Sequence, residues 1–191
     1  MRNIVTAALL SATAIAAPAA AQEQAPFTGP RAEAVVGWDR IQGGGDHADG
    51  VSYGGQVGYD FQSGFGLIGI EGEATGSSAD RCTGPASATN PNLCLKAGRD
   101  LYAGARIGTV LGENTLLYGK VGYTNARVRL TSDNGTSTTT LTGRNLDGVR
   151  VGAGLEHKFG GNFYGKAEYR YSNYEDGVSR HGVLAGVGVR F

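Results

Sequence analysis

Residues 51–61 read VSYGGQVGYDF, and this stretch decides the fold. Its odd-numbered positions hold valine, tyrosine, glycine and phenylalanine, whereas its even-numbered positions hold serine, glycine, glutamine and aspartate. Successive side chains of a β-strand point to opposite sides, so a period of two predicts a strand with one apolar and one polar face.

Seven more segments alternate in the same way, at 31–41, 65–74, 100–108, 116–130, 149–156, 166–172 and 183–191. The connections between them are alternately short, at 62–64, 111–114 and 160–162, and long, at 42–50, 75–97, 131–144 and 173–180. Eight antiparallel strands with short turns at one end and long polar loops at the other are typical of an up-and-down bacterial outer-membrane barrel. In such a barrel both chain termini and the short turns lie on the periplasmic side.

Composition excludes several other classes of protein. The 191 residues carry 17 basic and 17 acidic side chains, so the net charge of +0 gives no electrostatic reason to bind nucleic acid. Glycine is unusually frequent at 33 residues, yet proline is only 5 and no triplet repeat occurs, which excludes collagen-like and proline-rich disordered chains.

The N-terminus has the features of a secretory signal peptide. Arg2 precedes an Ala-rich apolar stretch at 4–17, and Pro18 and three alanines follow it. We expect cleavage after Ala21, which leaves residues 22–191 as the barrel domain, because small residues occupy the −3 and −1 positions. The stretch is too short to span a membrane comfortably as a helix.

Periodicity alone does not say which face of the strands points inward. A soluble lipocalin-like barrel would bury the apolar face, and it remains an alternative. Two features favour the membrane barrel: the polar face is dense in glycine, which suits a crowded narrow interior, and aromatic residues gather toward the strand ends as interfacial girdles do. These aromatic residues are Tyr59, Phe61, Phe159, Phe163, Tyr169 and Tyr171.

Several strand motifs resemble the small outer-membrane β-barrels of Gram-negative bacteria, the OmpA-like and opacity-protein-like surface antigens. The motifs are ARIG at 105–108, LLYGKVGY at 116–123, GAGLE at 152–156, KAEYRY at 166–171 and VGVRF at 187–191. The resemblance implies an outer-membrane location and an assembly signal at the terminal Phe191, read by the outer-membrane assembly machinery. Because the chain ends at this strand, we expect no peptidoglycan-binding domain like that of larger OmpA-like proteins.

If the polar face points inward, nine charged side chains converge on a narrow lumen. They are Glu71, Glu73, Arg106, Lys120, Arg150, Glu156, Lys166, Glu168 and Arg170. An unpaired buried charge would cost several kcal/mol, so we expect a network of ion pairs and water. The network forms either an interior plug that fixes the strand register or a narrow, gated ion path.

The predicted extracellular end carries three further features. Arg127 and Arg129 continue the lipid-facing side of their strand beyond Tyr123, where they either bind lipopolysaccharide phosphates or are solvated charges. Cys82 and Cys94 lie in one loop of an exported chain, which favours a disulfide over a metal site. The polar loop at 131–140 is a possible adhesive or antigenic contact, or simply a soluble surface.

A search for catalytic groups finds little. His47, His157 and His181 are dispersed, so no metal site is expected, and no cofactor is implied. His181 lies near Ser179 and Glu175, the one grouping that hints at a hydrolase, but the flanking residues match no barrel hydrolase. The sequence therefore predicts a structural and surface-interaction protein without enzymatic activity. A narrow passive channel is the first alternative, and an outer-membrane lipid-modifying enzyme is the second.

Overall fold

A computed structural model describes residues 25–82, 92–133 and 138–191. The expected signal peptide at 1–21 lies outside these residues. The described part is almost entirely β-structure, with one short 3-10 turn, η1 (Glu175–Gly177). It contains no helix that is long and apolar enough to cross a membrane.

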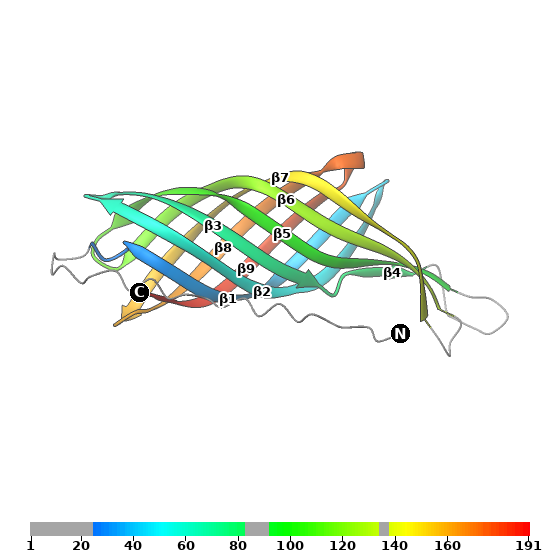
Figure 1. Ribbon diagram of the computed structural model, residues 1–191, viewed down its shortest axis with the longest axis horizontal. Helices are drawn as coiled ribbons and strands as arrows, with labels where there is room; N and C mark the ends of the chain where they lie inside the picture. Colours follow the sequence, from blue (N-terminus) through cyan, green and yellow to red (C-terminus); the bar gives the residue numbers. More distant parts are fainter. Residues whose placement is uncertain (1–24, 83–91, 134–137) are drawn as a thin grey trace, which may run out of the picture.

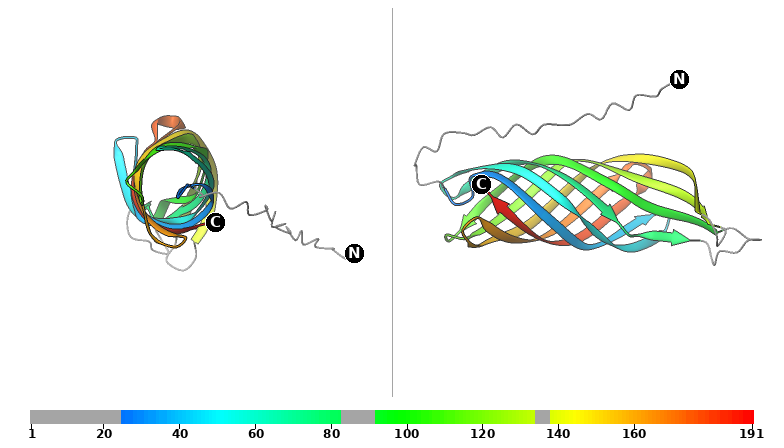
Figure 2. Two further views of the ribbon diagram at one scale, coloured as in Figure 1. Left: turned by 90° about the vertical axis from the view of Figure 1, so that its left-hand side faces the viewer. Right: turned by 60° about the horizontal axis from the view of Figure 1, so that its bottom comes forward.

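Eight long strands form a closed ring, so the predicted fold is confirmed. They are β1 (Gly29–Gly43), β2 (Asp46–Ser63), β3 (Gly66–Ser77), β5 (Asn92–Leu111), β6 (Thr115–Asp133), β7 (Thr138–Gly160), β8 (Phe163–Tyr174) and β9 (Ser179–Arg190). Each strand pairs antiparallel with its neighbours in the chain, β1 pairs with β9, and β3 pairs with β5 to complete the ring. A view along the axis shows the closed cylinder (Figure 2, left). The three-residue β4 (Asp80–Cys82) pairs with β5 alongside the ring.

The short turns are where the sequence places them, at the end of the barrel that carries both the C-terminus and the start of β1 (Figure 1). The prediction of long irregular loops at the other end was wrong in three places, one of which is the predicted loop at 75–97, where β5 already begins at Asn92. β1 and β2 continue pairing to a tight turn at Gly44 and Gly45, both with positive φ, instead of leaving a loop at 42–50. β6 and β7 likewise continue to Asp133 and from Thr138. Antiparallel pairing satisfies the backbone groups of both strands, so it persists beyond the end predicted from side-chain alternation.

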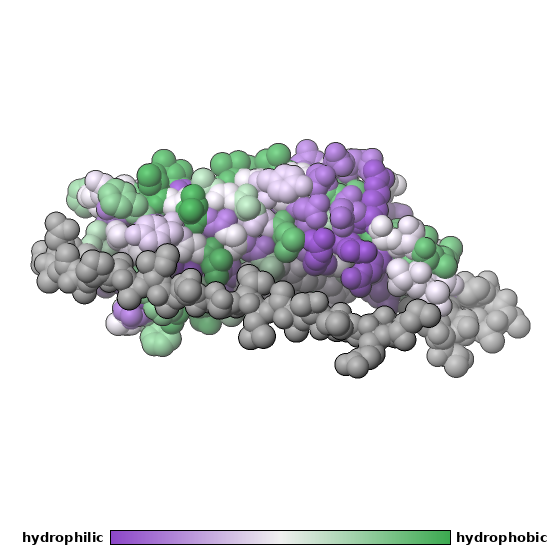
Figure 3. Space-filling model, in the orientation of Figure 1, coloured by the Kyte–Doolittle hydropathy of each residue, from purple (hydrophilic) through white to green (hydrophobic). Residues whose placement is uncertain are grey.

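The apolar side chains of the alternating pattern lie on the outside of the cylinder. Val57 is 61% exposed and Ile70 is 68% exposed, whereas Gln56 and Glu71, their neighbours along the strands, are buried. The space-filling view shows apolar residues spread over the part of the wall nearer the short turns and a hydrophilic zone nearer the other end (Figure 3). This distribution is that of a barrel whose wall faces lipid and whose far rim faces water.

Three strands extend well beyond the rim of the barrel. β7 has 23 residues and β6 has 19, against 12 for β8. The parts of β5, β6 and β7 that lie farthest from the short turns, with β4 beside them, form a sheet that projects from the rim (Figure 1). We refer to these projecting parts of β5 (92–99), β6 (127–133) and β7 (138–147), together with β4, as the strand extension.

Candidate functional site

The interior of the barrel is filled with charged side chains. Eight basic and eight acidic residues are buried in the described part of the chain. All nine residues that the sequence predicts for the lumen are among them, and the other seven are Arg31, Glu33, Asp39, Asp60, Asp100, Arg180 and Arg190. The two signs therefore balance within the lumen.

Asp60 is the centre of the group nearest the short turns. Its carboxylate accepts hydrogen bonds from the Arg106 Nε at 2.8 Å and from an Arg190 guanidinium nitrogen at 2.7 Å, and the Arg31 Nε lies 3.1 Å away. Glu156 accepts from the same two arginines, Arg106 at 3.1 Å and Arg190 at 2.6 Å. Five strands thus meet in one ion-pair cluster.

Two lysines hold the middle of the lumen. The Lys120 Nζ lies 3.0 Å from Glu71 and 2.9 Å from Glu168, and the Tyr118 hydroxyl donates to Glu168 at 2.7 Å. The Lys166 Nζ lies 3.1 Å from Glu33 and donates to the Gln56 side chain at 2.6 Å. Each ammonium group therefore bridges side chains from different strands.

Arginines and carboxylates continue the network toward the extracellular rim. Arg150 donates to Glu73 at 2.9 Å, and Arg180 donates to Asp100 at 2.8 Å. Asp100 also accepts from the hydroxyls of Thr124 at 2.7 Å and Tyr174 at 2.8 Å. Other ion pairs in this part of the lumen join Arg150 to Asp100, Arg170 to Glu73 and Arg180 to Asp39. Ion pairs therefore follow one another from one end of the lumen to the other.

The periplasmic mouth is covered by a residue that the sequence analysis missed. Phe27 is fully buried, and its backbone nitrogen donates to the Gln62 side chain at 3.0 Å. Arg190 donates to the Phe27 carbonyl at 2.7 Å, and Lys158 donates to the Pro26 carbonyl at 2.8 Å. No alternating pattern precedes β1, so periodicity offered no signal for this plug.

Glycines on the inner face make room for the large side chains. A Cβ added at Gly154 would lie 2.6 Å from the Tyr118 hydroxyl oxygen, and one added at Gly188 would lie 2.6 Å from the Tyr164 hydroxyl oxygen. The glycine-rich polar face is thus a consequence of packing in a narrow interior.

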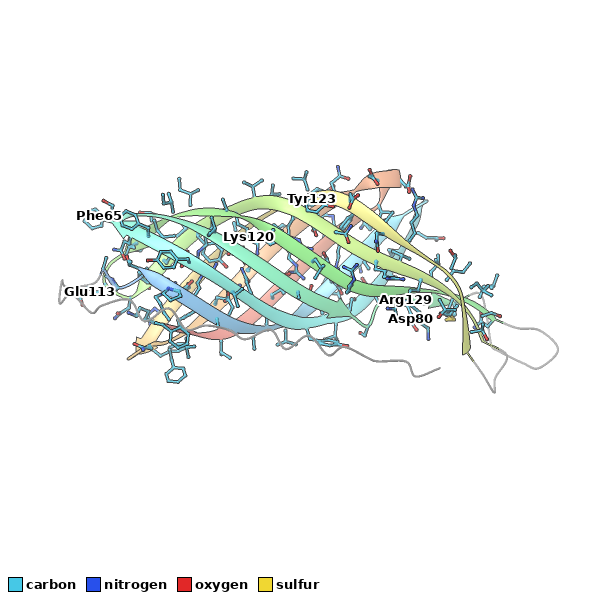
Figure 4. The ribbon with its side chains drawn as sticks, in the orientation of Figure 1. Phe65, Asp80, Glu113, Lys120, Tyr123 and Arg129 are labelled. Atoms are coloured by element: carbon cyan, nitrogen blue, oxygen red, sulfur yellow. A yellow bond between two sulfur atoms is a disulfide. The ribbon has the colours of Figure 1, made fainter. Side chains whose placement is uncertain are left out.

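The two rim arginines lie on the strand extension, above the outward-facing Tyr123. Arg129 is exposed and pairs across strands with Lys96 and Gly143, and Arg127 pairs with Asn145. Figure 4 shows Arg129 near Asp80 at the extension, at the opposite end from Phe65 and Glu113. The residues paired directly with these arginines are therefore basic or neutral, and the acidic Asp80 pairs with Lys96 on the other side of that residue.

Aromatic residues mark two levels on the outer wall. Phe61, Phe65, Phe159 and Phe163 are exposed near the short turns, and Trp38, Tyr53, Tyr123 and Tyr169 are exposed toward the other end. Two of the residues expected in the girdles lie elsewhere. Tyr59 lies two residues from Phe61 along β2, nearer the middle of the outer wall, and Tyr171 is half-buried beside His181. Rings at both levels are typical of the two membrane interfaces.

The structure also places the cysteines, the C-terminus and the histidines. Cys82 and Cys94 form the expected disulfide, which joins β4 to β5. The exposed Phe191 follows β9, and its backbone nitrogen donates to the Pro30 carbonyl at 2.9 Å. The His181 ring nitrogen shares a hydrogen bond with the Tyr169 hydroxyl at 2.8 Å, and within residues 25–82, 92–133 and 138–191 no group of three metal-ligating side chains occurs.

A closed ring of eight antiparallel strands, an apolar wall with aromatic girdles and a charged interior define an eight-stranded outer-membrane β-barrel. The chain belongs to the outer membrane protein beta-barrel domain family, which residues 7–191 match. It is 30% identical over 207 residues to the 25 kDa outer-membrane immunogenic protein of Brucella ovis, an alignment that covers 98% of this chain and 96% of the relative. The protein is located in the outer membrane of a Gram-negative bacterium.

Two solved structures share the fold. The attachment invasion locus protein Ail of Yersinia pestis, in complex with the heparin analogue sucrose octasulfate, matches with a TM-score of 0.58 at 18% identity over 85% of this chain and 99% of Ail. Neisserial surface protein A matches with a TM-score of 0.58 at 18% identity over 86% of this chain and 98% of its own. These two structures bear on the fold alone. The structural and surface-interaction role predicted from the sequence rests on the family and on the outer-membrane immunogenic relative.

Proposed function

We propose that this protein supports the integrity of the outer membrane and presents its strand extension as an antigenic or adhesive surface, with a lumen that is closed to ions. The observation that carries the proposal is the lumen itself, in which eight cations and eight anions are buried and neutralise one another. An ion entering this lumen would have to displace paired charges, and breaking a buried ion pair costs several kcal/mol.

Planar bilayer recording tests the closed lumen. Refolded protein inserted into a bilayer is expected to show no current or only small, brief openings. A large-pore porin added to the same bilayer serves as the positive control for insertion and recording. Large, steady currents from this protein would support the alternative, a narrow passive channel.

The rim arginines are proposed to bind lipopolysaccharide phosphates. Arg127 and Arg129 face outward beyond the girdle residue Tyr123, and guanidinium groups bind phosphate with paired hydrogen bonds. The heparin analogue bound by Ail is likewise a polyanion, which supports an anionic ligand for this surface.

Substitution of both rim arginines tests this contact. An Arg127→Gln, Arg129→Gln variant is expected to lose affinity for immobilised lipopolysaccharide, whereas Arg144→Gln, at an arginine that pairs with Asp176, is expected to keep it. Equal binding by the double variant and the unchanged protein would mean that the two arginines are solvated charges without a lipid role.

Processing and assembly complete the proposal. Removal of residues 1–21 predicts a mature N-terminus at Gln22, which N-terminal sequencing of protein from outer membranes would reveal. Phe191 is proposed to be read by the assembly machinery, so Phe191→Ser is expected to slow insertion in cells, while Phe159→Ser on the barrel wall is not. Equal insertion of both variants would remove this role from Phe191.

No catalytic role is assigned to the Ser179, His181 and Glu175 grouping. The His181 ring shares a hydrogen bond with the Tyr169 hydroxyl, and both side chains lie on the outer wall. A lipid-deacylation assay on refolded protein is expected to show no turnover. Turnover that disappears in a His181→Ala variant would establish the lipid-modifying enzyme instead.

A further inference from the structure

The chain before β1 closes the periplasmic mouth without belonging to the barrel wall. Pairing of β1 with β2 begins at Gly29 and pairing with β9 begins at Arg31, so residues 25–28 take no part in the strand ladders. We refer to residues 25–28 as the plug. The Thr28 amide donates to the Ala25 carbonyl at 2.8 Å, which makes the plug a tight turn of its own. The view along the axis in Figure 2 (left) looks onto this mouth.

An apolar cup lies beneath the plug. Leu67 of β3, Val110 of β5 and Leu116 of β6 are buried and form one cluster with the rings of Phe27 and Tyr118. The three aliphatic residues stand next to the short turns, at strand ends whose inner side would face periplasmic water if the plug were absent. Burial of these side chains is favourable only while an apolar group covers them, so the cup is matched to an aromatic side chain.

The rim of the cup holds the plug backbone through side chains of three further strands. Lys158 of β7 donates to the Pro26 carbonyl at 2.8 Å, and Arg190 of β9 donates to the Phe27 carbonyl at 2.7 Å. The Phe27 amide donates to the Gln62 side chain of β2 at 3.0 Å. The cup and its rim therefore recognise one aromatic ring and the main-chain groups beside it, which another segment with an aromatic residue would also offer.

The two cations at the rim differ in their partners. Arg190 also contacts Asp60 at 2.7 Å and Glu156 at 2.6 Å, so its charge is neutralised inside the lumen. The Lys158 ammonium donates instead to the neutral Pro26 carbonyl and lies 5.9 Å from the centre of the Phe27 ring. A segment with an acidic residue beside its aromatic one would add an ion pair with Lys158 that the plug does not make.

The plug can leave the mouth without breaking the strand ladders. Gly29 joins it to β1 with a φ of +121°, a conformation that favours glycine, and a Cβ at this position would collide with the Phe191 carbonyl oxygen. With the expected cleavage after Ala21, the plug would also lie close to a free chain end. Rotation at Gly29 would therefore open the cup to the periplasm while the ring of strands stays closed.

We propose that the periplasmic mouth is a binding site for a segment of a periplasmic polypeptide that carries an aromatic residue beside an acidic one, and that the plug occupies this site as a built-in competitor. The partner's ring would fill the cup of Leu67, Val110 and Leu116, and its carboxylate would pair with Lys158. The tether gives the plug a high effective concentration, so it keeps the site closed until a partner competes with it. This inference goes beyond the function proposed above, because it places a partner on the side opposite the strand extension.

A capped peptide with the sequence of residues 25–28, but with glutamate in the position of Pro26, is the probe. It is titrated against the refolded full chain in lipid nanodiscs. Phe27→Ala vacates the cup and is expected to bind the peptide about tenfold more tightly than the unchanged protein, because the tethered competitor has lost its ring. Phe65→Ala, at an exposed ring beside the short turns, is the matched control and is expected to bind like the unchanged protein.

The acidic part of the partner is tested in the Phe27→Ala background. Adding Lys158→Met is expected to weaken binding of the glutamate peptide about threefold, the factor that an ion pair near the surface supplies. A peptide with lysine in place of glutamate is expected to bind more weakly than the glutamate peptide. Equal binding of the two peptides, or no effect of Lys158→Met, would overturn the acidic partner.

Thiol labelling shows whether the plug leaves the mouth of the folded barrel. Both cysteines of the chain form the disulfide, so a water-soluble maleimide labels only an introduced thiol. Val110→Cys is expected to be labelled slowly with Phe27 in place, about tenfold faster with Phe27→Ala, and to be protected by the peptide in that variant. Thr124→Cys, fully buried farther along the lumen, is expected to stay unlabelled in the same time.

Several results would overturn the site. They are equal labelling of Val110→Cys with and without Phe27→Ala, no labelling of Val110→Cys before Thr124→Cys is labelled, and no binding of the peptide to Phe27→Ala. The labelling with Phe27 in place does not depend on a variant of the plug being folded. None of these results would bear on the closed lumen, which the bilayer recording tests separately.

Discussion

Asp60 shows how much one buried carboxylate does in this lumen. Arg31, Arg106 and Arg190 all contact it, from three different strands. Its removal would leave three buried guanidinium groups short of negative charge. The cost of an unpaired buried charge, rather than the strength of any single ion pair, is what makes such a residue indispensable.

We expect Asp60→Asn to lower the free energy of unfolding by about 3–5 kcal/mol, the range observed when one partner of a buried ion pair is removed. Urea unfolding in lipid vesicles, followed by tryptophan fluorescence, measures the change. Glu113→Gln, at the periplasmic turn between β5 and β6, is the matched control and is expected to have little effect. Equal stability of the two variants would contradict the charge-packed lumen.

The hairpin of β1 and β2 carries an ion pair beyond the girdle residue Trp38 that makes a pH-dependent contribution. The hydrogen bond from Arg40, whose Nε lies 2.7 Å from Asp49, lowers the pKa of the Asp49 carboxyl below its usual value, and the charges of Arg40 and His47 act in the same direction. A lowered pKa means that the stabilisation is present above the unfolded-state pKa and is lost as the pH falls through the folded-state pKa. Carboxyl-carbon NMR titration should therefore show a higher midpoint for Asp49 in an Arg40→Gln variant. An unchanged midpoint would show that the ion pair is absent in solution.

At the level of single residues, the sequence predicts which side of the wall a residue faces better than it predicts which side chains that residue contacts. Alternation identified nine of the lumen charges, because side-chain direction is a local property of a strand. Arg180 was missed because it fell within a predicted loop, although β9 includes it. The pairing of Arg180 with Asp39 and Asp100 joins strands far apart in the chain, and no local pattern encodes that contact.

At the level of strands, the chemistry of a turn decided where the prediction was wrong. The stretch at 42–50 was expected to be a loop because its glycines and polar residues break the alternation. Two consecutive glycines with positive φ instead form the tight turn that a hairpin needs, and pairing extends through the polar residues on either side. In an extracellular hairpin the side chains need not alternate, because water surrounds both faces.

Two glycines on neighbouring strands test the packing of the interior. Gly154→Ala is expected to destabilise the barrel by about 1–3 kcal/mol, since the new methyl group would lie against the Tyr118 ring and displace its hydroxyl from Glu168. Gly119→Ala is the control, because its nearest neighbouring atom would lie 3.8 Å away, in ordinary contact. Heat-dependent mobility of the folded barrel on gels measures both. Equal melting of the two variants would argue against a crowded interior.

For the whole molecule, one division of the side chains accounts for both location and function. Apolar residues form the wall, which fits a lipid surround, and neutralising charges fill the core, which fits a closed lumen. A period of two predicted the eight strands and their two faces. The glycine-rich polar face and the aromatic residues near the strand ends then indicated that the apolar face lies outside. The sequence did not predict the strand extension or the Phe27 plug, since each depends on contacts between distant segments.

The most direct test of this division places a fluorophore on the wall. In a Trp38→Phe background, Val121→Trp would lie in the middle of the outer wall, where Val121 is 54% exposed. Refolded into vesicles of brominated lipid, this tryptophan is expected to emit at short wavelength and to be strongly quenched, because bromine atoms on the acyl chains would touch it. Emission at long wavelength without quenching by brominated lipid would place the residue away from the acyl chains and contradict the account.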